Sequence, residues 1–476
     1  MSLASYAFGI LQLLVVLACF GFSAFRIRSW LIPSFDGAPA RLVESVLGVG
    51  MLIIAAELLG LFSLIHGWTL ILSGLLLAAV CWLRVYPGET DEGLRPPQPA
   101  ISNGARVFAF VVVAVLVAQW AAFVSYNLDH GITNFDSVWY HMPYAADIAQ
   151  TGSSLSFHRT ETVFLNWFYP QNSEIFQGAS VALTGRDFVS IFINMGWLGL
   201  ALLAGWCVGR PYGRPHLTML ASAVLLTTHT MVVREPGTGK NDIVAVALTL
   251  AVVAILINRG AAARDGRGRL SPDWIMAAAG LAAGLAAGTK VTALAPVAMI
   301  TFTVLFATID GRRLRAAAIW FVSAFVGGGF WYLRSLIASG NPLPQLESIG
   351  PLDLPGPERL QVGRQDFNVF HYITDLDIWR DYFLPGLESG FGSLWPLLIL
   401  VALVGLLALA FRGPGRLCRA HGFAALVAIA CYLITPLGAA GPEGDPTAFA
   451  INLRFLVPAL AVALALVPLL PWFDRS

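Results

Sequence analysis

The sequence has little charge. Asp, Glu, Lys and Arg make up only 12% of its 476 residues, whereas 57% are hydrophobic. A soluble domain carries about 25% charged residues to cover its surface, so the composition excludes a soluble globular protein and indicates a polytopic membrane protein. The formal net charge of +1 also argues against nucleic acid as a partner, because nucleic-acid-binding proteins concentrate basic residues on one face. The partner that the composition does predict is the lipid bilayer.

Cysteine is scarce too, and its placement argues against a disulfide or zinc site. None of the five cysteines shows a CxxC or other metal-ligand spacing, and all lie within or beside apolar stretches. We interpret them as small buried apolar side chains. The sequence therefore predicts no resident cofactor and leaves a divalent metal ion as an open alternative.

Apolar runs of membrane-spanning length are abundant. A hydrocarbon core about 30 Å thick requires about 20 helical residues, and about thirteen runs approach that length. The predicted spans are 1–25, 42–64, 68–86, 106–127, 187–208, 216–233, 241–258, 274–289, 291–308, 316–337, 392–411, 421–438 and 450–470. We predict an all-α polytopic membrane protein with about thirteen transmembrane helices and amphipathic helices in its first long extracytoplasmic loop.

The arginines between the spans predict the orientation. Most of them fall in loops that alternation assigns to the inside: 209–216, 258–270, 310–315 and 412–419. Most acids fall in loops assigned to the outside: 128–186, 234–240, 288–291, 338–391 and 439–450. We therefore expect a multi-pass plasma-membrane protein whose functional residues share the extracytoplasmic face.

The first long outer loop, 134–177, concentrates acids, aromatics and histidines. Asp136 lies near the start of a predicted amphipathic helix, with Tyr140 four residues later on the same side. Pro143 must either kink or start that helix. Asp136 is therefore either a helix cap or a functional acid. His141 and His158 are either interfacial polar residues or bases and metal ligands.

Aromatic residues of the same loop allow two interpretations. They form either an interfacial belt at the headgroup level or a surface for sugar stacking and acceptor contact. The residues are Trp139, Tyr140, Trp167, Phe168 and Tyr169.

A second charged cluster joins two spans in the segment 234–242, which contains Glu235, Lys240 and Asp242. Ionised groups at the membrane edge are costly and mark functional sites. Asp242 also begins the next span, where an acid stabilises the helix dipole. Capping is therefore the alternative for Asp242.

Three cations approach the same outer leaflet. They are Lys290, Arg334 and Arg454. Each either extends to the lipid headgroups or binds an anionic group such as a lipid phosphate. The Gly280, Gly284 and Gly288 series ahead of Lys290 lacks nucleotide-loop spacing and predicts close helix packing.

These motifs in this order resemble the GT-C superfamily of polyprenyl-phosphate-sugar-dependent glycosyltransferases, near its protein mannosyltransferase and aminoarabinose transferase branch. The resemblance is carried by Asp136 with Tyr140, by 169–172, by 240–242, by 288–290, and by Arg334 followed by 340–342. It covers about 106–345, which would be the catalytic membrane module. Residues 1–105 would be additional helices with a cytoplasmic linker rich in Pro, Gly and charge at 86–106, and 346–476 an outer loop and C-terminal helices.

The resemblance implies an inverting glycosyltransferase of the cell envelope. Asp136 would be the general base, Asp242 a second acid of the site, and Lys290, with Arg334, the donor-phosphate contact. Further substrate contacts would come from the remaining polar candidates: Tyr140, His141, Tyr169, Glu235, Lys240 and Arg454. The donor would be a polyprenyl-phosphate-linked sugar, and the acceptor a hydroxyl of a saccharide, lipid or protein. Phe168 and Tyr169 stand where the aminoarabinose branch carries an acid and a lysine, so the acceptor and any metal dependence stay open.

The chemistry fits a site with one base and a few cations. A lipid phosphate is already a stable leaving group, so the site needs a proton acceptor and positive charge. A single displacement without a carboxylate nucleophile inverts the anomeric centre, by analogy with glycosidases. Two alternatives remain: a transporter or flippase of lipid-linked saccharides, and a non-catalytic membrane partner of an envelope-assembly complex. A transporter predicts internal repeats and broken helices, and the sequence shows neither.

Overall fold

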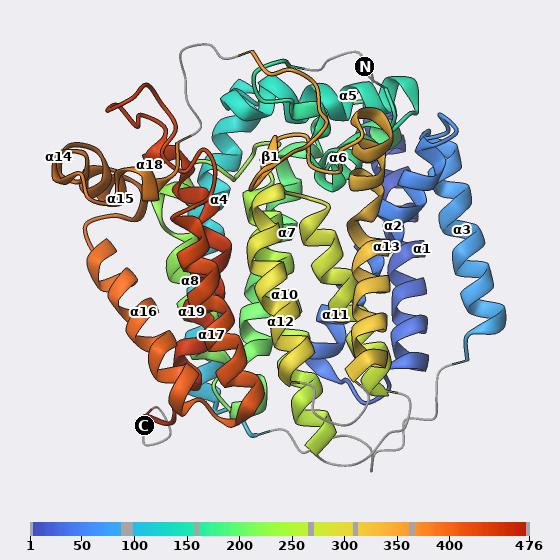
Figure 1. The fold of residues 1–476 in the computed structure, drawn as a ribbon. Helices are drawn as coiled ribbons and strands as arrows, with labels where there is room; N and C mark the ends of the chain where they lie inside the picture. Colours follow the sequence, from blue (N-terminus) through green and yellow to red (C-terminus); the bar gives the residue numbers. More distant parts are fainter. Residues whose placement is uncertain are drawn as a thin grey trace.

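The computed structural model describes residues 3–86, 99–156, 161–264, 271–307, 313–360 and 367–472, and of 261–264, 271 and 307 the backbone alone. His158 and most of the predicted linker lie outside these ranges. Within them the regular elements are helices and one two-stranded antiparallel hairpin (Figure 1). The hairpin pairs β1 (Ser348–Ile349) with β2 (Leu352–Asp353).

The helices follow one another in the order predicted from the apolar runs. The N-terminal half contains α1 (Leu3–Leu31), α2 (Gly37–Gly60), α3 (Gly67–Arg84), α4 (Asn103–His130), η2 (Ser137–His141), α5 (Met142–Thr151), η3 (Asn166–Phe168), α6 (Asn172–Thr184), α7 (Ser190–Gly209), η4 (Arg210–Tyr212), α8 (Pro215–Leu226) and α9 (His229–Val232). The rest contains α10 (Asp242–Arg264), α11 (Ser271–Ala287), η5 (Val291–Ala293), α12 (Leu294–Ala307), α13 (Arg313–Ser339), η6 (Val369–Tyr372), α14 (Leu376–Ile378), η7 (Trp379–Phe383), α15 (Leu384–Phe391), α16 (Trp395–Arg412), α17 (Gly415–Tyr432), α18 (Phe449–Asn452), η8 (Leu453–Phe455), α19 (Val457–Leu466) and η9 (Val467–Leu469).

A helix lies in every range predicted to span the membrane. Eight of the described helices are long and apolar enough to cross it. The number of candidate spans rises to nine if the bent pair Phe449–Phe455 and Val457–Leu469 is counted as one span. Three further apolar helices are shorter: Pro215–Leu226, Pro272–Ala287 and Val291–Phe306. The all-α, multi-pass membrane class is confirmed, and the count of about thirteen spans stays a prediction.

α10 occupies the centre of the bundle. Its apolar window is 89% buried, against 22% for the peripheral helices α3, α4 and α16. A helix that is apolar on every side has no face for water and packs among other helices. α7, α11 and α19 surround it, so the residues at its N-terminus, Asp242 first, emerge in the middle of one end of the bundle.

The glycine series in α11 confirms the predicted close packing. A Cβ on Gly280 would lie 2.9 Å from the carbonyl oxygen of Trp320 in α13, and a Cβ on Gly284 would collide with the carbonyl of Ala324. From the other side, a Cβ on Gly328 would collide with the carbonyl of Gly284. Small residues let two backbones approach closely where there is no hydrophobic drive to bring them together. The contact holds α11, and with it the corner at Lys290, in a fixed place.

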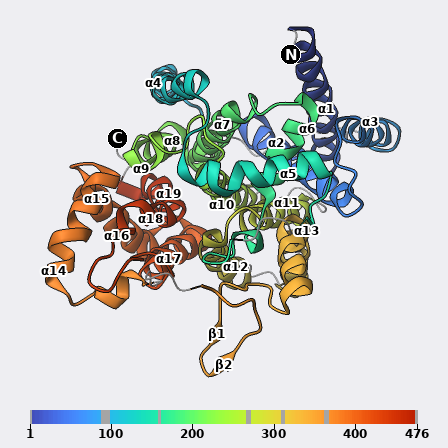
Figure 2. The ribbon, with the colours of Figure 1, turned by 90° about the horizontal axis from the view of Figure 1, so that it is seen from above.

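α5 and α6 lie across one end of the bundle, which we call the α5 face (Figures 1 and 2). They fall in the predicted first outer loop and pack on each other. Asn172 at the start of α6 attaches this layer to the bundle, because its amide donates to Gly327 O (2.9 Å) and its Oδ1 accepts from Nε1 of Trp331 (2.6 Å).

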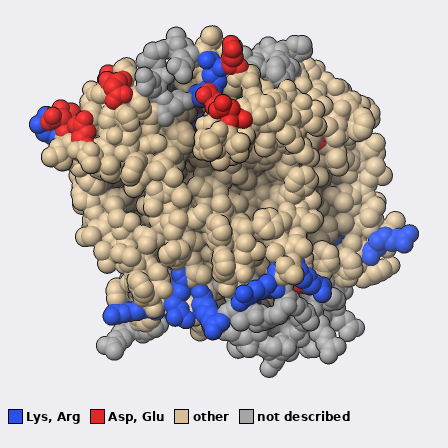
Figure 3. Space-filling model, in the orientation of Figure 1, with Lys and Arg blue, Asp and Glu red and all other residues tan. Residues whose placement is uncertain are grey.

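Charge is distributed unevenly along the bundle axis. The side view shows a broad belt without Lys, Arg, Asp or Glu, as expected for the lipid-facing surface (Figure 3). Basic side chains gather at the end opposite the α5 face, and most of the visible acidic ones lie at the α5 face.

Candidate functional site

Six predicted site residues form one charged cluster beneath the α5 face. We call it the ionic cluster, and its members are Asp136, Glu235, Lys240, Asp242, Lys290 and Arg454. They come from four separate places in the chain: the residue before η2, the segment between α9 and α10, the corner after α11, and η8. Up to 318 residues of sequence separate the members that touch.

Lys240 and Arg454 hold the acids together. The Lys240 Nζ lies 3.3 Å from Asp242, 3.6 Å from Glu235 and 3.8 Å from Asp136. Arg454 makes an ion pair with Asp136 and lies 4.0 Å from Asp242. Asp136 and Asp242 therefore share two cations, Lys240 and Arg454.

Lys290 completes the cluster on the far side of Asp242. Its ammonium group makes an ion pair with Asp242 Oδ1 and a hydrogen bond of 3.3 Å to Asn241 Oδ1. Lys290 and Asp136 are therefore not in contact but are joined through Asp242, Lys240 and Arg454.

The cluster is largely removed from water. The side chains of Glu235, Lys240 and Asp242 are 0%, 2% and 2% exposed, whereas Asp136 is 16% exposed, and Lys290 and Arg454 13% each. Unpaired charge in such a place is very unfavourable, so each acid must meet a cation. The more exposed half of the cluster is the half that a ligand reaches first.

Local backbone chemistry fixes the segment between α9 and α10. Gly237 has a φ of +71°, and a Cβ there would meet the Asn127 amide nitrogen at 2.7 Å, so glycine is required on both counts. The Asn127 amide in turn donates to Pro236 O at 3.2 Å. Asn194 of α7 donates to three carbonyl groups of the same segment: Glu235, Thr238 and Lys240.

The helix predicted after Asp136 contains a π-turn. In η2 the Met142 N–H donates to Ser137 O, five residues back, and Pro143 follows in the first turn of α5. Proline has no N–H for an ordinary helical bond, so a widened turn just before it leaves fewer groups unpaired. Pro143 therefore lies in the first turn of α5, where the widened turn accommodates it. The side chain of Asp136 makes no capping bond, and the capping interpretation of this acid is wrong.

The surroundings shift the pKa values of Asp136 and Glu235 in opposite directions. Burial opposes ionisation of Asp136, but Arg454 and Lys240 outweigh it and lower its pKa to about 2. Burial, with the negative charge of Asp242, raises the pKa of Glu235 to about 7 despite Lys240 nearby. Burial lowers the pKa of Lys290, against the opposing effect of Asp242. Because Glu235 is only partly ionised near neutral pH, the cluster carries less negative charge than its three acids would give, which favours the approach of an anion.

A buried His–Glu pair lies beside the ionic cluster. Nδ1 of His141 is hydrogen-bonded to Oε1 of Glu174 in α6, and the two residues are 1% and 2% exposed. The Tyr140 ring lies against His141 with centroids 3.9 Å apart and the ring planes tilted by 35°. It also lies near Trp139 at 5.6 Å and Tyr169 at 6.0 Å. Glu174 is absent from the sequence-based prediction, since nothing in the sequence pairs it with a histidine 33 residues away.

Arg334 lies outside the ionic cluster. Its guanidinium donates to carbonyl oxygens of Ser154, Trp167 and Tyr169 and to Oε1 of Gln171. It stacks on the rings of Trp167 and Trp331, 4.0 Å and 4.6 Å away. Its observed partners thus attach the first outer loop to α13, and a role in phosphate binding stays a prediction.

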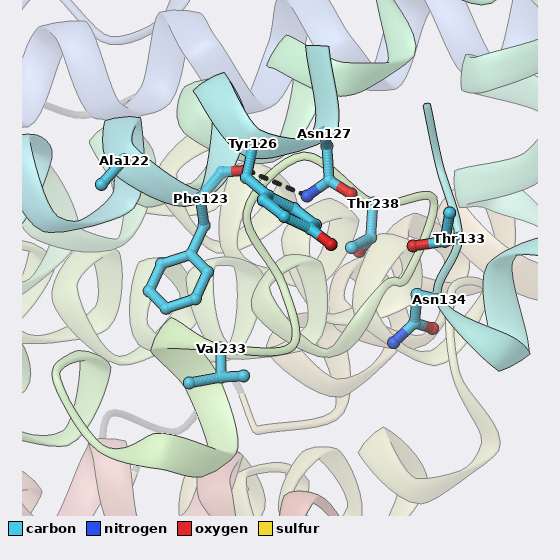
Figure 4. Close-up of a pocket in the computed structure, with 8 residues that line it drawn as sticks. All are labelled: Ala122, Phe123, Tyr126, Asn127, Thr133, Asn134, Val233 and Thr238. Atoms are coloured by element: carbon cyan, nitrogen blue, oxygen red, sulfur yellow. Dashed lines mark hydrogen bonds between the residues drawn. The ribbon is translucent and has the colours of Figure 1, made fainter. Parts of the chain in front are cut away.

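A pocket of about 390 Å³ opens at the edge of the cluster (Figure 4). Asn134 and Thr238, each two residues from a cluster member, form part of its wall. The other lining residues are Ala122, Phe123, Tyr126, Asn127, Thr133 and Val233. The lining is uncharged and carries amide and hydroxyl groups beside two aromatic rings.

The hairpin loop covers a different part of the α5 face. Gln345 donates to Leu165 O at 3.3 Å, Arg359 to Val163 O at 3.1 Å, and Leu360 N to Thr162 O at 3.2 Å. The outer loop 338–391 therefore rests in part on the 161–165 segment.

The ionic cluster does not fit a divalent metal ion. Each of its carboxylates already faces a lysine or arginine, and a metal ion would have to sit among three cations. Across the described ranges, no three His, Cys, Asp or Glu side chains gather in a ligand-like set. We derive no step through a metal.

The chain was compared with protein-family models, with curated protein sequences and with solved structures. None of the three comparisons found a match.

Proposed function

We propose that this protein is an inverting glycosyltransferase that moves a sugar from a polyprenyl-phosphate donor to a hydroxyl acceptor at the extracytoplasmic membrane face. The observation that supports this most is the ionic cluster itself: acids and cations from four segments meet, nearly buried, at one end of a membrane bundle. Buried ionisable groups at membrane depth are costly to keep and mark functional sites.

The cations provide the phosphate contact. Lys290 and Arg454 are the two more exposed cations of the cluster, and both approach Asp242. A donor phosphate that reaches them meets a net positive charge in a low-dielectric setting, where electrostatic attraction is strong. The same charge stabilises the phosphate as it leaves the sugar.

Asp136 is the proposed proton acceptor. While paired with Arg454 it is a weak base, because its pKa is about 2. A bound phosphate competes with Asp136 for Arg454. As Asp136 loses this partner, its pKa rises to its ordinary value and above it. Donor binding thus prepares the base, and the acceptor is not deprotonated before the donor is in place.

The reaction balances without a further reagent. The acceptor oxygen attacks C1 of the sugar, the bond from C1 to the phosphate oxygen breaks, and the acceptor proton goes to Asp136. The leaving phosphate keeps the electron pair of the broken bond. One displacement inverts the configuration at C1.

One observation favours the second candidate, a transporter of lipid-linked saccharides. Phe449–Phe455 and Val457–Leu469 form a helix pair bent by 54°, and Arg454 lies just before the bend. Transporters place ion and substrate sites at such breaks. The break here lies at the α5 face, beside Asp136, rather than midway along the bundle, which fits a site at the membrane surface better.

A transfer assay separates the two candidates. The protein in nanodiscs is incubated with a panel of radiolabelled polyprenyl-phosphate monosaccharides and hydroxyl acceptors, and lipid transport is followed separately in proteoliposomes. We expect Asp136→Asn to lower transfer at least about 100-fold, since general base catalysis contributes about that much. The exposed Asp381, in the outer loop 338–391, provides the matched control Asp381→Asn. Transfer by Asp136→Asn at the wild-type rate, or transport without transfer, would refute the proposal.

A further inference from the structure

The pocket of Figure 4 borders the ionic cluster, and we call it the α4 pocket. Its lining residue Asn134 accepts at Oδ1 from the N–H and the hydroxyl of Ser137, each at 3.4 Å, and these two residues flank Asp136 in the chain. Oγ of Ser137 accepts in turn from the Gly239 N–H at 3.1 Å, directly after the lining residue Thr238. The wall of the pocket is therefore joined to the segment that carries Asp136.

The uncharged lining of the α4 pocket does not suit a phosphate. A phosphate there would lose water without meeting a cation, which is unfavourable. Lys290, the proposed phosphate contact, bonds to Asp242 and Asn241, and neither of them lines the pocket. The pocket therefore suits the uncharged substrate of a transfer reaction rather than the phosphate of the donor.

Several polar groups of the lining are free to meet a ligand. The amide nitrogen of Asn127 donates to Pro236 O at 3.2 Å and to a carbonyl of α4 at 3.0 Å, which fixes the orientation of the amide and leaves its Oδ1 unpaired among the described residues. No described residue hydrogen-bonds to the hydroxyls of Tyr126 and Thr133 or to the amide nitrogen of Asn134. The pocket thus offers a ligand hydrogen-bond donors as well as acceptors.

The pocket has a polar side and an apolar side. In Figure 4 the hydroxyls of Tyr126 and Thr133 point toward each other, and Phe123 and Val233 lie on the opposite side. A pyranose has the same character, because its C–H groups form apolar faces while each of its hydroxyls donates and accepts. An alcohol with one hydroxyl would leave most of the polar groups unpaired, which is costly. The volume of about 390 Å³ lies within the range of about 300–1,000 Å³ that is usual for small-molecule sites.

We propose that the α4 pocket binds the acceptor, and that this acceptor is an uncharged saccharide. The proposal rests on the proposed glycosyl transfer and names its acceptor class. The saccharide pairs with the free groups of Tyr126, Asn127 and Thr133 and turns one hydroxyl toward Asp136, whose side chain is 16% exposed. The donor phosphate binds at Lys290. The bonds that form and break are those of the transfer given above.

The first experiment measures binding alone. The protein in nanodiscs is titrated with methyl glucopyranoside, methyl mannopyranoside and methyl galactopyranoside, with methyl glucuronide as a charged counterpart, and saturation-transfer-difference NMR reports binding. We expect at least one neutral glycoside to bind more tightly than the glucuronide. Ala122→Trp should abolish this binding by filling the pocket. The matched control is Ala121→Trp, at the neighbouring exposed position of α4 outside the lining, which should bind as wild type does.

A double variant tests the polar groups. Tyr126→Phe with Thr133→Val removes both free hydroxyls, and because neither has a partner among the described residues, the fold should be retained. We expect binding to weaken about tenfold or more, since two hydrogen bonds are lost. Binding of no neutral glycoside, or binding that survives Ala122→Trp, would overturn the proposal. A lipid that native mass spectrometry finds on wild-type protein but not on Ala122→Trp would assign the pocket to lipid instead.

The second experiment separates the two substrates in the transfer assay. The double variant should raise the KM for the saccharide acceptor about tenfold or more and leave the KM for the donor unchanged. Lys290→Gln should do the reverse. If sugar is transferred and the double variant leaves the acceptor KM unchanged, the acceptor pocket is refuted and the transfer stands. If wild-type protein transfers no sugar but binds a neutral glycoside that Ala122→Trp excludes, the transfer fails and the saccharide site stands.

Discussion

Asp136 and Arg454 provide a direct test of the ionic cluster, because their pairing should stabilise the folded protein. The pKa of Asp136 falls from 3.8 to about 2 on folding, after burial has opposed the change. At about 1.36 kcal/mol per unit, this corresponds to about 2 kcal/mol of stability. Since Asp136 is only 16% exposed, solvent screening reduces this little.

The sign of the pH effect follows from the direction of the shift. A lowered pKa means that the folded protein binds the Asp136 proton more weakly than the unfolded chain. The stabilisation is therefore present above about pH 3.8 and disappears as the pH falls toward 2. At neutral pH the pair contributes fully.

A double-mutant cycle measures the pair. Asp136→Asn, Arg454→Gln and the combined variant are unfolded reversibly in mixed lipid–SDS micelles at neutral pH. We expect a coupling free energy of at least about 2 kcal/mol, because Arg454 must offset the burial of Asp136 as well as lower its pKa. The exposed pair Arg380–Asp381 is the control and should show no resolvable coupling. A coupling near zero for the buried pair would mean that the two side chains do not meet, and the described cluster would be wrong.

Three further predictions concern other parts of the molecule. The raised pKa of Glu235 makes the folded protein lose stability as the pH rises from 4.5 through about 7. The stability of Glu235→Gln should therefore depend less on pH and should exceed that of wild type above pH 7, as denaturation at several pH values would show. Lys290→Gln should raise the KM for a polyprenyl-phosphate donor about tenfold or more, because a charged hydrogen bond is lost. An unchanged KM would show that Lys290 does not contact the donor. Gly284→Leu should destabilise the bundle by about 2 kcal/mol or more because its side chain collides with α13, whereas Gly196→Leu, where a Cβ meets nothing within 4 Å, should not.

The chain's composition determined the fold class. A sequence with few charges and many apolar runs can only hide its backbone polar groups in helices that span the bilayer, so helix positions follow from hydropathy alone. The glycine series in α11 was equally readable, because small residues at four-residue spacing form one face of a helix. Thirteen spans were expected, but the lengths of helices such as Pro215–Leu226 leave that number open.

Only part of the candidate site could be predicted from the sequence. Charged residues stand out against an apolar background, so Asp136, Lys240, Asp242, Lys290 and Arg454 could be named from the sequence. Which of them touch could not, since hydropathy carries no information on how helix ends are arranged around α10. For the same reason the sequence could not predict the partners of Arg334, which are backbone carbonyl groups and aromatic rings rather than an acid.

The tertiary structure decided three things that the sequence left open. The side chain of Asp136 pairs with Arg454 and makes no capping bond. The packing of α5 on α6 brought Glu174 to His141. Packing also separated the pKa values of two acids: burial raises that of Glu235 to about 7, whereas Arg454 and Lys240 outweigh burial at Asp136 and keep it ionised. Local sequence sets which side chains are present and which helices form, but distances between remote segments, and the dielectric around them, exist only once the helices have packed.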